Sequence, residues 1–199
     1  MNKLACGIGI NDRKYSAKIN HKHTKEYTLW INMLKRFDGK YSARNTTYKE
    51  LKISENFKHY SFFYEWCQEQ IGFNSIDKNG KLYELDKDLL VKGNKLYSED
   101  TCVFIPHRIN SLLIKCNSAR GDSPIGVYWC TSESKYHSLC SDGKGNQKYL
   151  GSFISEEKAF QAYKSYKDAL IKEVAEEYKD CVDKRVYQAL MSYKVSIDD

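Results

Sequence analysis

The sequence predicts an α+β protein, with a helical N-terminal part and a C-terminal three-stranded antiparallel sheet packed on one helix. Three observations carry this prediction. Apolar residues recur at helical spacing before residue 72, short β-rich segments follow Pro124, and an acidic helix start follows the last of these segments. Such a change of hydrophobic period marks a change of element type. The 199 residues are enough for one large domain or two small ones.

Two amphipathic helices are expected in the N-terminal part, over residues 25–36 and 60–71. Their apolar residues recur every three or four positions, as on one face of a helix. These residues are Tyr27, Trp30, Ile31 and Leu34 in the first helix, and Phe63, Trp66, Cys67 and Ile71 in the second. Residues 1–20 are expected to form an extended arm.

The central segment has the pattern of strand, loop, strand and helix. Residues 81–90 alternate weakly and are expected to form a strand, followed by a loop over residues 91–100. Residues 101–105 form a short β-rich run, and Pro106 suits the first turn of a helix over residues 107–114. This core and the N-terminal helices make a predicted domain of residues 1–116, and the turn-rich residues 117–124 are the predicted linker to a domain of residues 125–199.

Three short strands and a long helix are expected after Pro124. The strands cover residues 125–130, 135–141 and 147–154, and turn-forming residues separate them. Ser155 is expected to cap the helix, with acidic residues in its first turn. Strand alternation gives the sheet two faces. Expected toward the helix are Val127, Trp129, Tyr136, Ser138, Cys140 and Leu150; expected on the open face or its edges are Tyr128, Lys135, His137, Leu139, Ser141, Gln147 and Tyr149.

The net charge of +6 favours polyanionic partners. No long apolar run is present, so neither a signal peptide nor a membrane partner is expected. The seven cysteines are odd in number and show no C-x-x-C pair, which favours free thiols in a reducing cytoplasm over a zinc site.

An antiparallel sheet with one open face can enter the major groove of DNA. Lys135, Lys144 and Lys148 are placed to meet phosphates, which supply affinity without sequence information. Two alternatives stay open. The face can simply meet water, or Tyr128 and Tyr149 can stack single-stranded RNA.

A series of marks recurs in order along this C-terminal segment. They are Gly126-Val127, Tyr136, the run Tyr149-Leu150-Gly151-x-Phe153, and the helix start with Glu156, Glu157 and Ala159. With these marks, about 45 residues resemble the AP2-type DNA-binding domain. The resemblance implies binding of double-stranded DNA, with the sheet reading the major groove. It places Tyr128, Cys130, Leu139, Ser141, Gln147 and Tyr149 at reading positions, none of them arginine.

Hard oxygen donors gather in the central segment. Asp86-Lys87-Asp88 ends the predicted strand, and Asn110 lies one turn inside the predicted helix. Carboxylate and amide oxygens suit Mg²⁺ or Mn²⁺. A solvated turn is the alternative.

The order of Asp88, residues 101–105 and Asn110 resembles the ββα core of HNH endonucleases of phage and homing type. The whole chain also resembles small phage proteins that pair such a core with an AP2-type module. The resemblance implies a metal-dependent DNA endonuclease, cutting or nicking, that works in the host cytoplasm if it is phage-encoded. Asp86, Asp88 and Asn110 would hold Mg²⁺ or Mn²⁺. The sequence does not identify a protein partner.

Leu89 occupies the position of that family's general-base histidine. Leucine cannot accept a proton, and loss of a general base costs about two to four orders of magnitude in rate. Three explanations stay open. Lys87 can assist a metal-bound water, or His107 can serve as the base. Alternatively the site is inactive, and the protein is a DNA-binding regulator or inhibitor. The first two explanations favour an enzyme with Asp88, Asn110, His107 and Lys87 as catalytic candidates.

Overall fold

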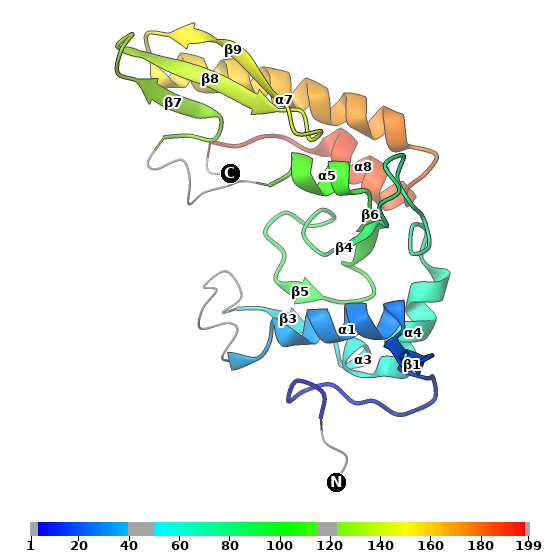
Figure 1. Cartoon of the computed structure of the whole chain (residues 1–199). Helices are drawn as coiled ribbons and strands as arrows, with labels where there is room; N and C mark the ends of the chain where they lie inside the picture. Colours follow the sequence, from blue (N-terminus) through cyan, green and yellow to red (C-terminus); the bar gives the residue numbers. More distant parts are fainter. Residues whose placement is uncertain (1–3, 40–49, 115–122, 198–199) are drawn as a thin grey trace. The chain divides into compact units, whose positions relative to one another are not determined.

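The computed structural model describes residues 4–39, 50–114 and 123–197 (Figure 1). The chain divides into two compact units, each of which is described by itself. Unit 1 comprises Met1–Ile76 and Leu85–Phe104, and unit 2 comprises Asp77–Glu84 and Ile105–Asp199. The elements are a mixture of helices and strands, which confirms the predicted α+β class. The predicted linker lies outside the described residues except for Ser123 and Pro124.

The helices and strands have the following bounds. Unit 1 contains β1 (Lys18–Ile19), β2 (Lys22–His23), α1 (Lys25–Lys35), β3 (Lys52–Ile53), α3 (Glu55–Lys58), α4 (Tyr60–Glu69) and β5 (Leu96–Tyr97). At the unit boundaries, β4 (Glu84–Asp86) and β6 (Val103–Ile105) pair with each other. Unit 2 contains α5 (His107–Leu112), β7 (Val127–Cys130), β8 (Lys135–Ser141), β9 (Gln147–Phe153), α7 (Glu156–Tyr178) and α8 (Lys184–Ser192).

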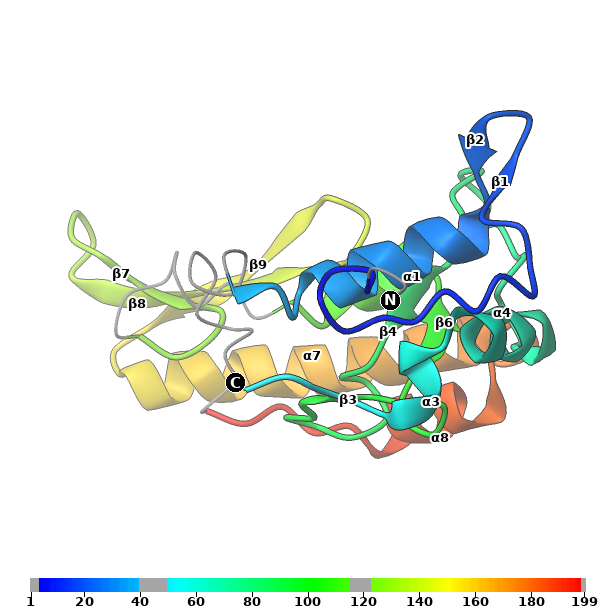
Figure 2. The same cartoon turned by 90° about the horizontal axis from the view of Figure 1, so that it is seen from below.

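Unit 1 is built on the two helices that the apolar spacing predicts. The helices α1 and α4 pack together, and the β1–β2 hairpin leads into the start of α1 (Figure 2). Thr24 caps α1 by accepting a hydrogen bond from the Tyr27 backbone N–H. The expected extended arm over residues 1–20 instead ends in the first strand of this hairpin. At Gly9 a side chain has no room, because a Cβ would lie 2.3 Å from Leu34 Cδ1.

An aromatic core holds unit 1 together. The rings of Trp30, Phe57, Tyr60, Phe63 and Trp66 are all buried, and the Trp30 indole N–H donates to the Phe57 carbonyl oxygen at 2.8 Å. Full burial of each large ring contributes about 2–3 kcal/mol. Most of the predicted helical faces therefore lie in the core of this unit. Ile71 is the exception, since it lies beyond the end of α4 and is 56% exposed.

The predicted strand over residues 81–90 is wrong in length, since only β4 is extended. It ends because the Asp86 carboxylate accepts the backbone N–H groups of Asp88 at 2.9 Å and Leu89 at 2.8 Å, which forms a turn. The predicted loop that follows contains β5, which pairs in parallel with β3. Two-residue strands of this kind carry too few residues to show a period.

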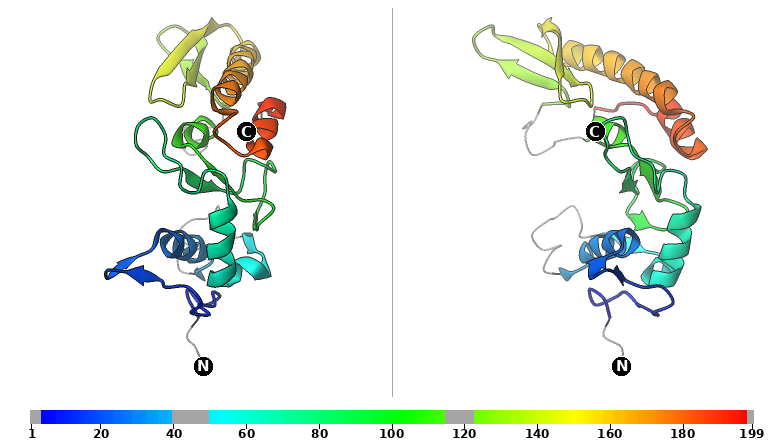
Figure 3. Two further views of the ribbon diagram at one scale, coloured as in Figure 1. Left: turned by 90° about the vertical axis from the view of Figure 1, so that its right-hand side faces the viewer. Right: turned by 45° about the vertical axis from the view of Figure 1, so that its right-hand side comes forward.

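The C-terminal sheet is confirmed as three-stranded and antiparallel, in the order β7-β8-β9, and it packs on α7. In Figure 3 the sheet and α7 form two layers. Ser155 caps α7 as predicted and accepts the Lys158 backbone N–H. The face toward α7 buries Val127, Ser138 and Cys140, as expected. Trp129, expected on the same face, is 48% exposed and packs edge-to-face on Tyr136.

The structure explains why glycine occurs at positions 126 and 151 of the C-terminal sheet. Gly126 has a φ of +78°, and a Cβ there would lie 2.0 Å from the Tyr163 ring of α7. Gly151 has a φ of +133° in the part of β9 where the β8–β9 register shifts between Ser138 and Leu139. Both backbone conformations favour glycine. Gly126 therefore allows the close approach of the sheet to the helix, whereas Gly151 accommodates the irregular backbone of β9.

A second C-terminal helix, α8, follows α7 after a break and packs on it. Asp183 caps it and accepts the Arg185 backbone N–H at 2.7 Å. Across the described ranges, no helix is both long enough and apolar enough to cross a membrane. The six cysteines of these ranges are free thiols.

Candidate functional site

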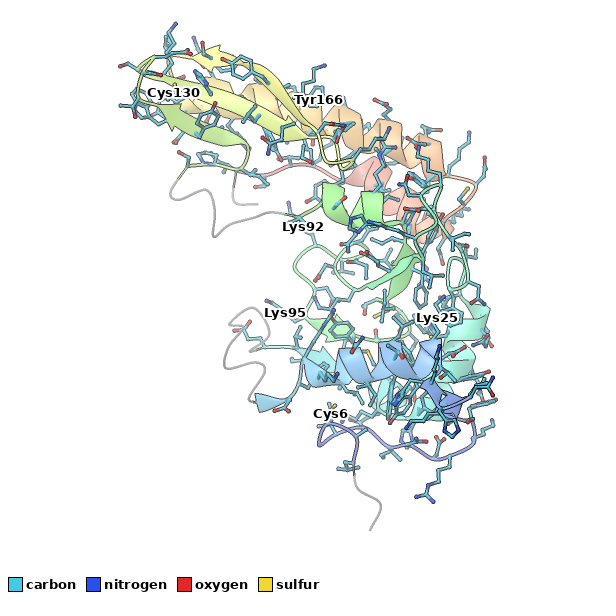
Figure 4. The ribbon with its side chains drawn as sticks, in the orientation of Figure 1. Cys6, Lys25, Lys92, Lys95, Cys130 and Tyr166 are labelled. Atoms are coloured by element: carbon cyan, nitrogen blue, oxygen red, sulfur yellow. The ribbon has the colours of Figure 1, made fainter. Side chains whose placement is uncertain are left out.

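The open face is defined here as the face of β7, β8 and β9 that points away from α7. Strand alternation and the observed register place on it Tyr128, Cys130, Lys135, His137, Leu139, Ser141, Gln147 and Tyr149. Most of these side chains are exposed, with Tyr128 at 42% and Tyr149 at 51%. Lys148 lies on the other face, and its ammonium group is 5.0 Å from the ring centre of Tyr166 on α7, a residue labelled in Figure 4.

A row of three aromatic rings crosses the open face. The ring of His137 on β8 lies 5.2 Å from Tyr128 on β7 and 5.3 Å from Tyr149 on β9, and both contacts are edge-to-face. His137 was expected on this face and is there, but it is buried to 6% exposure by its neighbours. The two tyrosines, not the histidine, therefore present the surface that a ligand would meet.

Hydrogen bonds fix the central ring of this row. His137 Nε2 donates to the Glu133 carboxylate at 2.9 Å, since a carboxylate only accepts. Nδ1 then accepts from the Tyr128 hydroxyl at 2.9 Å. The row is preorganised, so little side-chain entropy is lost when a ligand contacts it.

Glu133 is a residue that the sequence analysis missed. Cys130, Glu133 and His137 bring a sulfur, a carboxylate and an imidazole within 4.8 Å of one another, at the end of the sheet where Figure 4 labels Cys130. Such donors suit a zinc-like ion. The signal in the sequence was the i, i+3, i+7 spacing. In the structure His137 and Glu133 are bonded to each other, and Cys130 Sγ lies 3.2 Å from Ser132 Oγ.

A second group, here called the central cluster, consists of Glu84 on β4 with His107 and Asn110 on α5. Glu84 Oε1 lies 2.8 Å from His107 Nδ1, and Asn110 Nδ2 donates to Glu84 Oε2 at 2.5 Å. The side chains of Glu84 and His107 are 39% and 44% exposed, so a ligand can reach them. The sequence analysis selected His107 and Asn110 but not Glu84, which lies 23 residues from its histidine partner.

The acidic candidates Asp86 and Asp88 belong to unit 1, whereas Asn110 belongs to unit 2. Their convergence on one ion stays a prediction. Burial raises the pKa of the Asp86 carboxyl, and the nearby Asp88 charge adds to the effect. Two backbone N–H groups already donate to this carboxylate.

Lys87 and Asp88 form an ion pair. Lys87 is only 7% exposed, and its ammonium group also donates to the Asn94 carbonyl oxygen at 3.2 Å. Asn94 in turn donates to the Lys87 carbonyl oxygen at 2.7 Å. These contacts hold the lysine in a structural role within its loop. Leu89, at the position of the absent general base, is 7% exposed and belongs to the core.

Comparison of the chain with known proteins yields no match to a protein-family model, to a curated protein or to a solved structure.

Proposed function

We propose that the protein binds double-stranded DNA through the open face of β7, β8 and β9. The observation that carries the proposal is a three-stranded antiparallel sheet whose one face is covered by α7, while the other presents two exposed tyrosines and polar side chains. Strands of β-ribbons and β-sheets can read DNA from within its grooves. The resemblance to the AP2-type domain supports the same placement, and the net charge of +6 favours a polyanion.

The residue types on this face suit base recognition. Gln147 can pair with both hydrogen-bonding positions of an adenine edge in the major groove. Tyr128 and Tyr149 offer apolar rings for thymine methyl groups or sugars. Lys135, at the start of β8, and Lys144, in the turn before β9, are exposed and can reach phosphates, which set register rather than sequence.

Fluorescence anisotropy with labelled duplexes at several salt concentrations tests the proposal. Wild type should bind with log K falling linearly against log salt. The double variant Tyr128→Ala/Tyr149→Ala should bind about tenfold more weakly or worse, since central interface tyrosines carry much of the affinity. Tyr187→Ala, on α8, is the matched control. A double variant that binds duplex as tightly as wild type would show that the open face does not bind DNA. A preference for single-stranded RNA would favour the RNA-binding alternative.

A second candidate function is metal-dependent DNA hydrolysis, and the central cluster favours it. The Glu84 carboxylate holds the Nδ1–H of His107, which leaves Nε2 as a proton acceptor, the arrangement of a general base. This supports His107 over Lys87 as the base. Asp88 and Asn110, with Asp86, remain the proposed ligands of Mg²⁺ or Mn²⁺, which would polarise the scissile phosphate.

Incubation of supercoiled plasmid with purified protein and Mg²⁺, Mn²⁺ or EDTA tests this second candidate. Conversion to nicked or linear plasmid that requires the metal supports it. Intact plasmid, together with duplex binding, favours the alternative of a non-catalytic DNA-binding regulator or inhibitor.

A further inference from the structure

A pocket of about 460 Å³ lies in unit 2. Its walls are the turn over residues 77–81, the helix α5, the turn between β8 and β9, and Tyr178 at the end of α7. This volume is in the range of sites that bind small molecules. Three of its lining residues, His107, Ser141 and Lys144, also belong to the candidate sites described above.

Both turns of the pocket are held rigid by an aspartate. Asp77 accepts the backbone N–H groups of Asn79 at 2.8 Å and Lys81 at 2.9 Å. In the β8–β9 turn, Asp142 accepts the backbone N–H of Lys144 at 2.7 Å. The two carboxylates are thus engaged by backbone donors, and each turn carries a lysine into the pocket wall.

The β8–β9 turn is docked on α5. Ser111 Oγ donates to the Gly143 carbonyl oxygen at 3.1 Å, and a Cβ on Gly143 would lie 3.0 Å from the Arg108 carbonyl oxygen. Only a glycine allows this approach without displacement. The lysine on the turn therefore has a defined position relative to the arginine on the helix.

The pocket lining is cationic. Four basic side chains contribute to it, which are Lys78, Lys81, Arg108 and Lys144. Glu177 pairs with Lys78 at 2.9 Å and also with Arg108. Among the described residues, neither Lys81 nor Lys144 has an ion-pair partner. Asp77 also lines the pocket, so with Glu177 two negative charges stand against four positive ones, and a surplus of positive charge remains.

The buried side chain of Arg108 is a second observation, separate from the charge of the lining, that points to an anionic ligand. Arg108 is 7% exposed, and its Nε has no hydrogen-bond partner in the part of the chain that the structure describes. Leaving a buried guanidinium N–H unpaired costs free energy, and natural proteins avoid it. Arg108 also lines the pocket, so an anion bound there would lie beside its guanidinium group and offset the cost of burying this charge.

The pocket adjoins both candidate sites. Ser141 belongs to the open face and also lines the pocket, and His107 belongs to the central cluster and also lines it. A strand bound along the open face would therefore bring a phosphate to the pocket.

We propose that this pocket binds the phosphate group of a nucleotide, and that in the DNA complex this group is a backbone phosphodiester next to the sheet. The proposal rests on the proposed DNA binding for its second part only. Lys81, Lys144 and the Arg108 guanidinium contact the phosphate oxygens. Guanidinium and ammonium groups together form the usual donor set for this anion.

The test uses two probes on the full chain. Thymidine 3′,5′-bisphosphate, a small analogue of a strand phosphate, is titrated while backbone amide resonances are followed by NMR. Labelled duplex is titrated at several salt concentrations. The variant is Lys81→Ala/Lys144→Ala, whose lysines are exposed and outside the core. The control is Lys172→Ala, an exposed lysine of α7 that does not line the pocket.

In wild type the bisphosphate should shift the amides of Ser111, Gly143 and Lys144, and the double variant should lose this response. With duplex, the double variant should show a log K against log salt slope shallower by about 1, the share of one phosphate, on every sequence alike. Lys172→Ala should behave as wild type in both titrations.

The outcomes separate the two proposals. Duplex binding with unchanged affinity and slope in the double variant overturns the contact between the pocket and the DNA backbone and leaves DNA binding standing. A bisphosphate response that is unchanged in the double variant overturns the phosphate pocket itself. Another outcome is that wild type binds no duplex but responds to the bisphosphate, and that the double variant does not respond. This outcome overturns the proposed function and assigns the pocket to free nucleotides. A wild type that responds to neither probe overturns both.

Discussion

The carboxylate of Glu84 lies 2.8 Å from Nδ1 of His107 and accepts a second hydrogen bond from Asn110. Because a carboxylate only accepts, the proton sits on Nδ1 and the lone pair on Nε2. One side chain of β4 thus orients two side chains of α5. The central cluster therefore has a fixed histidine tautomer and a fixed side-chain orientation, which its three residues would lack if they did not contact one another.

The first prediction concerns cleavage. If the protein cuts plasmid DNA, His107→Ala should lower the rate by about two to four orders of magnitude, because it removes the base. Glu84→Gln should lower it too, because an amide can present its N–H to Nδ1 and favour the wrong tautomer. The duplex affinity of each variant, measured by anisotropy, should stay within a factor of about two of wild type, since each substitution removes at most one small contact with DNA. Wild-type cutting by both variants would assign the base elsewhere.

The second prediction concerns the contact between sheet and helix. Gly126→Ala should lower the free energy of unfolding by about 2–4 kcal/mol, which combines a left-handed backbone penalty with overpacking against Tyr163. Gly145→Ala is the matched control, because that glycine also has a positive φ but no atom within 4 Å of a built Cβ. It should cost about 1–2 kcal/mol. Urea denaturation followed by circular dichroism measures both, and equal losses would show that the Tyr163 contact carries no strain.

The third prediction concerns Asp86 and pH. Burial raises the pKa of this carboxyl above 3.8, so the folded state holds its proton more tightly than the unfolded chain. The protonated Asp86 carboxyl therefore contributes to the free energy of unfolding. This contribution is complete below pH 3.8 and is lost as pH rises through the folded-state pKa. Asp86→Asn keeps an oxygen for the N–H groups of Asp88 and Leu89.

The variant should therefore be more stable than wild type near neutral pH in EDTA, and the difference should shrink toward pH 4. Thermal unfolding of both proteins across this pH range measures it. A variant that is less stable at neutral pH, or a difference independent of pH, would contradict the assignment of a buried, reluctantly ionised carboxylate.

The fourth prediction separates base readout from phosphate contact. Gln147→Ala should weaken binding to a preferred duplex by about 1–3 kcal/mol and relax the preference at one base pair. Lys135→Ala should weaken binding to all duplexes alike and reduce the salt slope by about 1. A selection of bound duplexes from a random pool, followed by salt titrations, distinguishes the two. Identical behaviour of the two variants would argue against the open face as a reader of sequence.

The C-terminal sheet was largely predictable because its signals are local. The bounds of β8 match the predicted strand over residues 135–141, and Ser155 caps α7 as expected. Period-2 alternation, turn residues and a capping serine each act within a few positions of the chain. The burial of His137 on the open face was not predictable, since it depends on Tyr128 and Tyr149 from two other strands.

The central segment was less predictable for a different reason. The strand β4 is shorter than predicted because the Asp86 carboxylate accepts hydrogen bonds from two backbone N–H groups. In a longer strand these groups would donate to a neighbouring strand. Glu84 gave no sign of its role, because its partners lie on a helix more than twenty residues away. Side chains that act across elements leave no period in the sequence, and only the fold brings them together.

The hydrogen bond from Ser111 to the Gly143 carbonyl oxygen makes α5 and the β8–β9 turn one cooperative element. Ligand effects on two joined elements are reciprocal: an occupant that orders the turn stabilises α5 by the same free energy by which an ordered α5 tightens the occupant. If the sheet binds DNA as proposed, substitutions on α5 that loosen this contact should weaken the affinity although the substituted residue touches no nucleotide. Under the same proposal, any selection for binding at the sheet also acts on α5, the helix that bears His107.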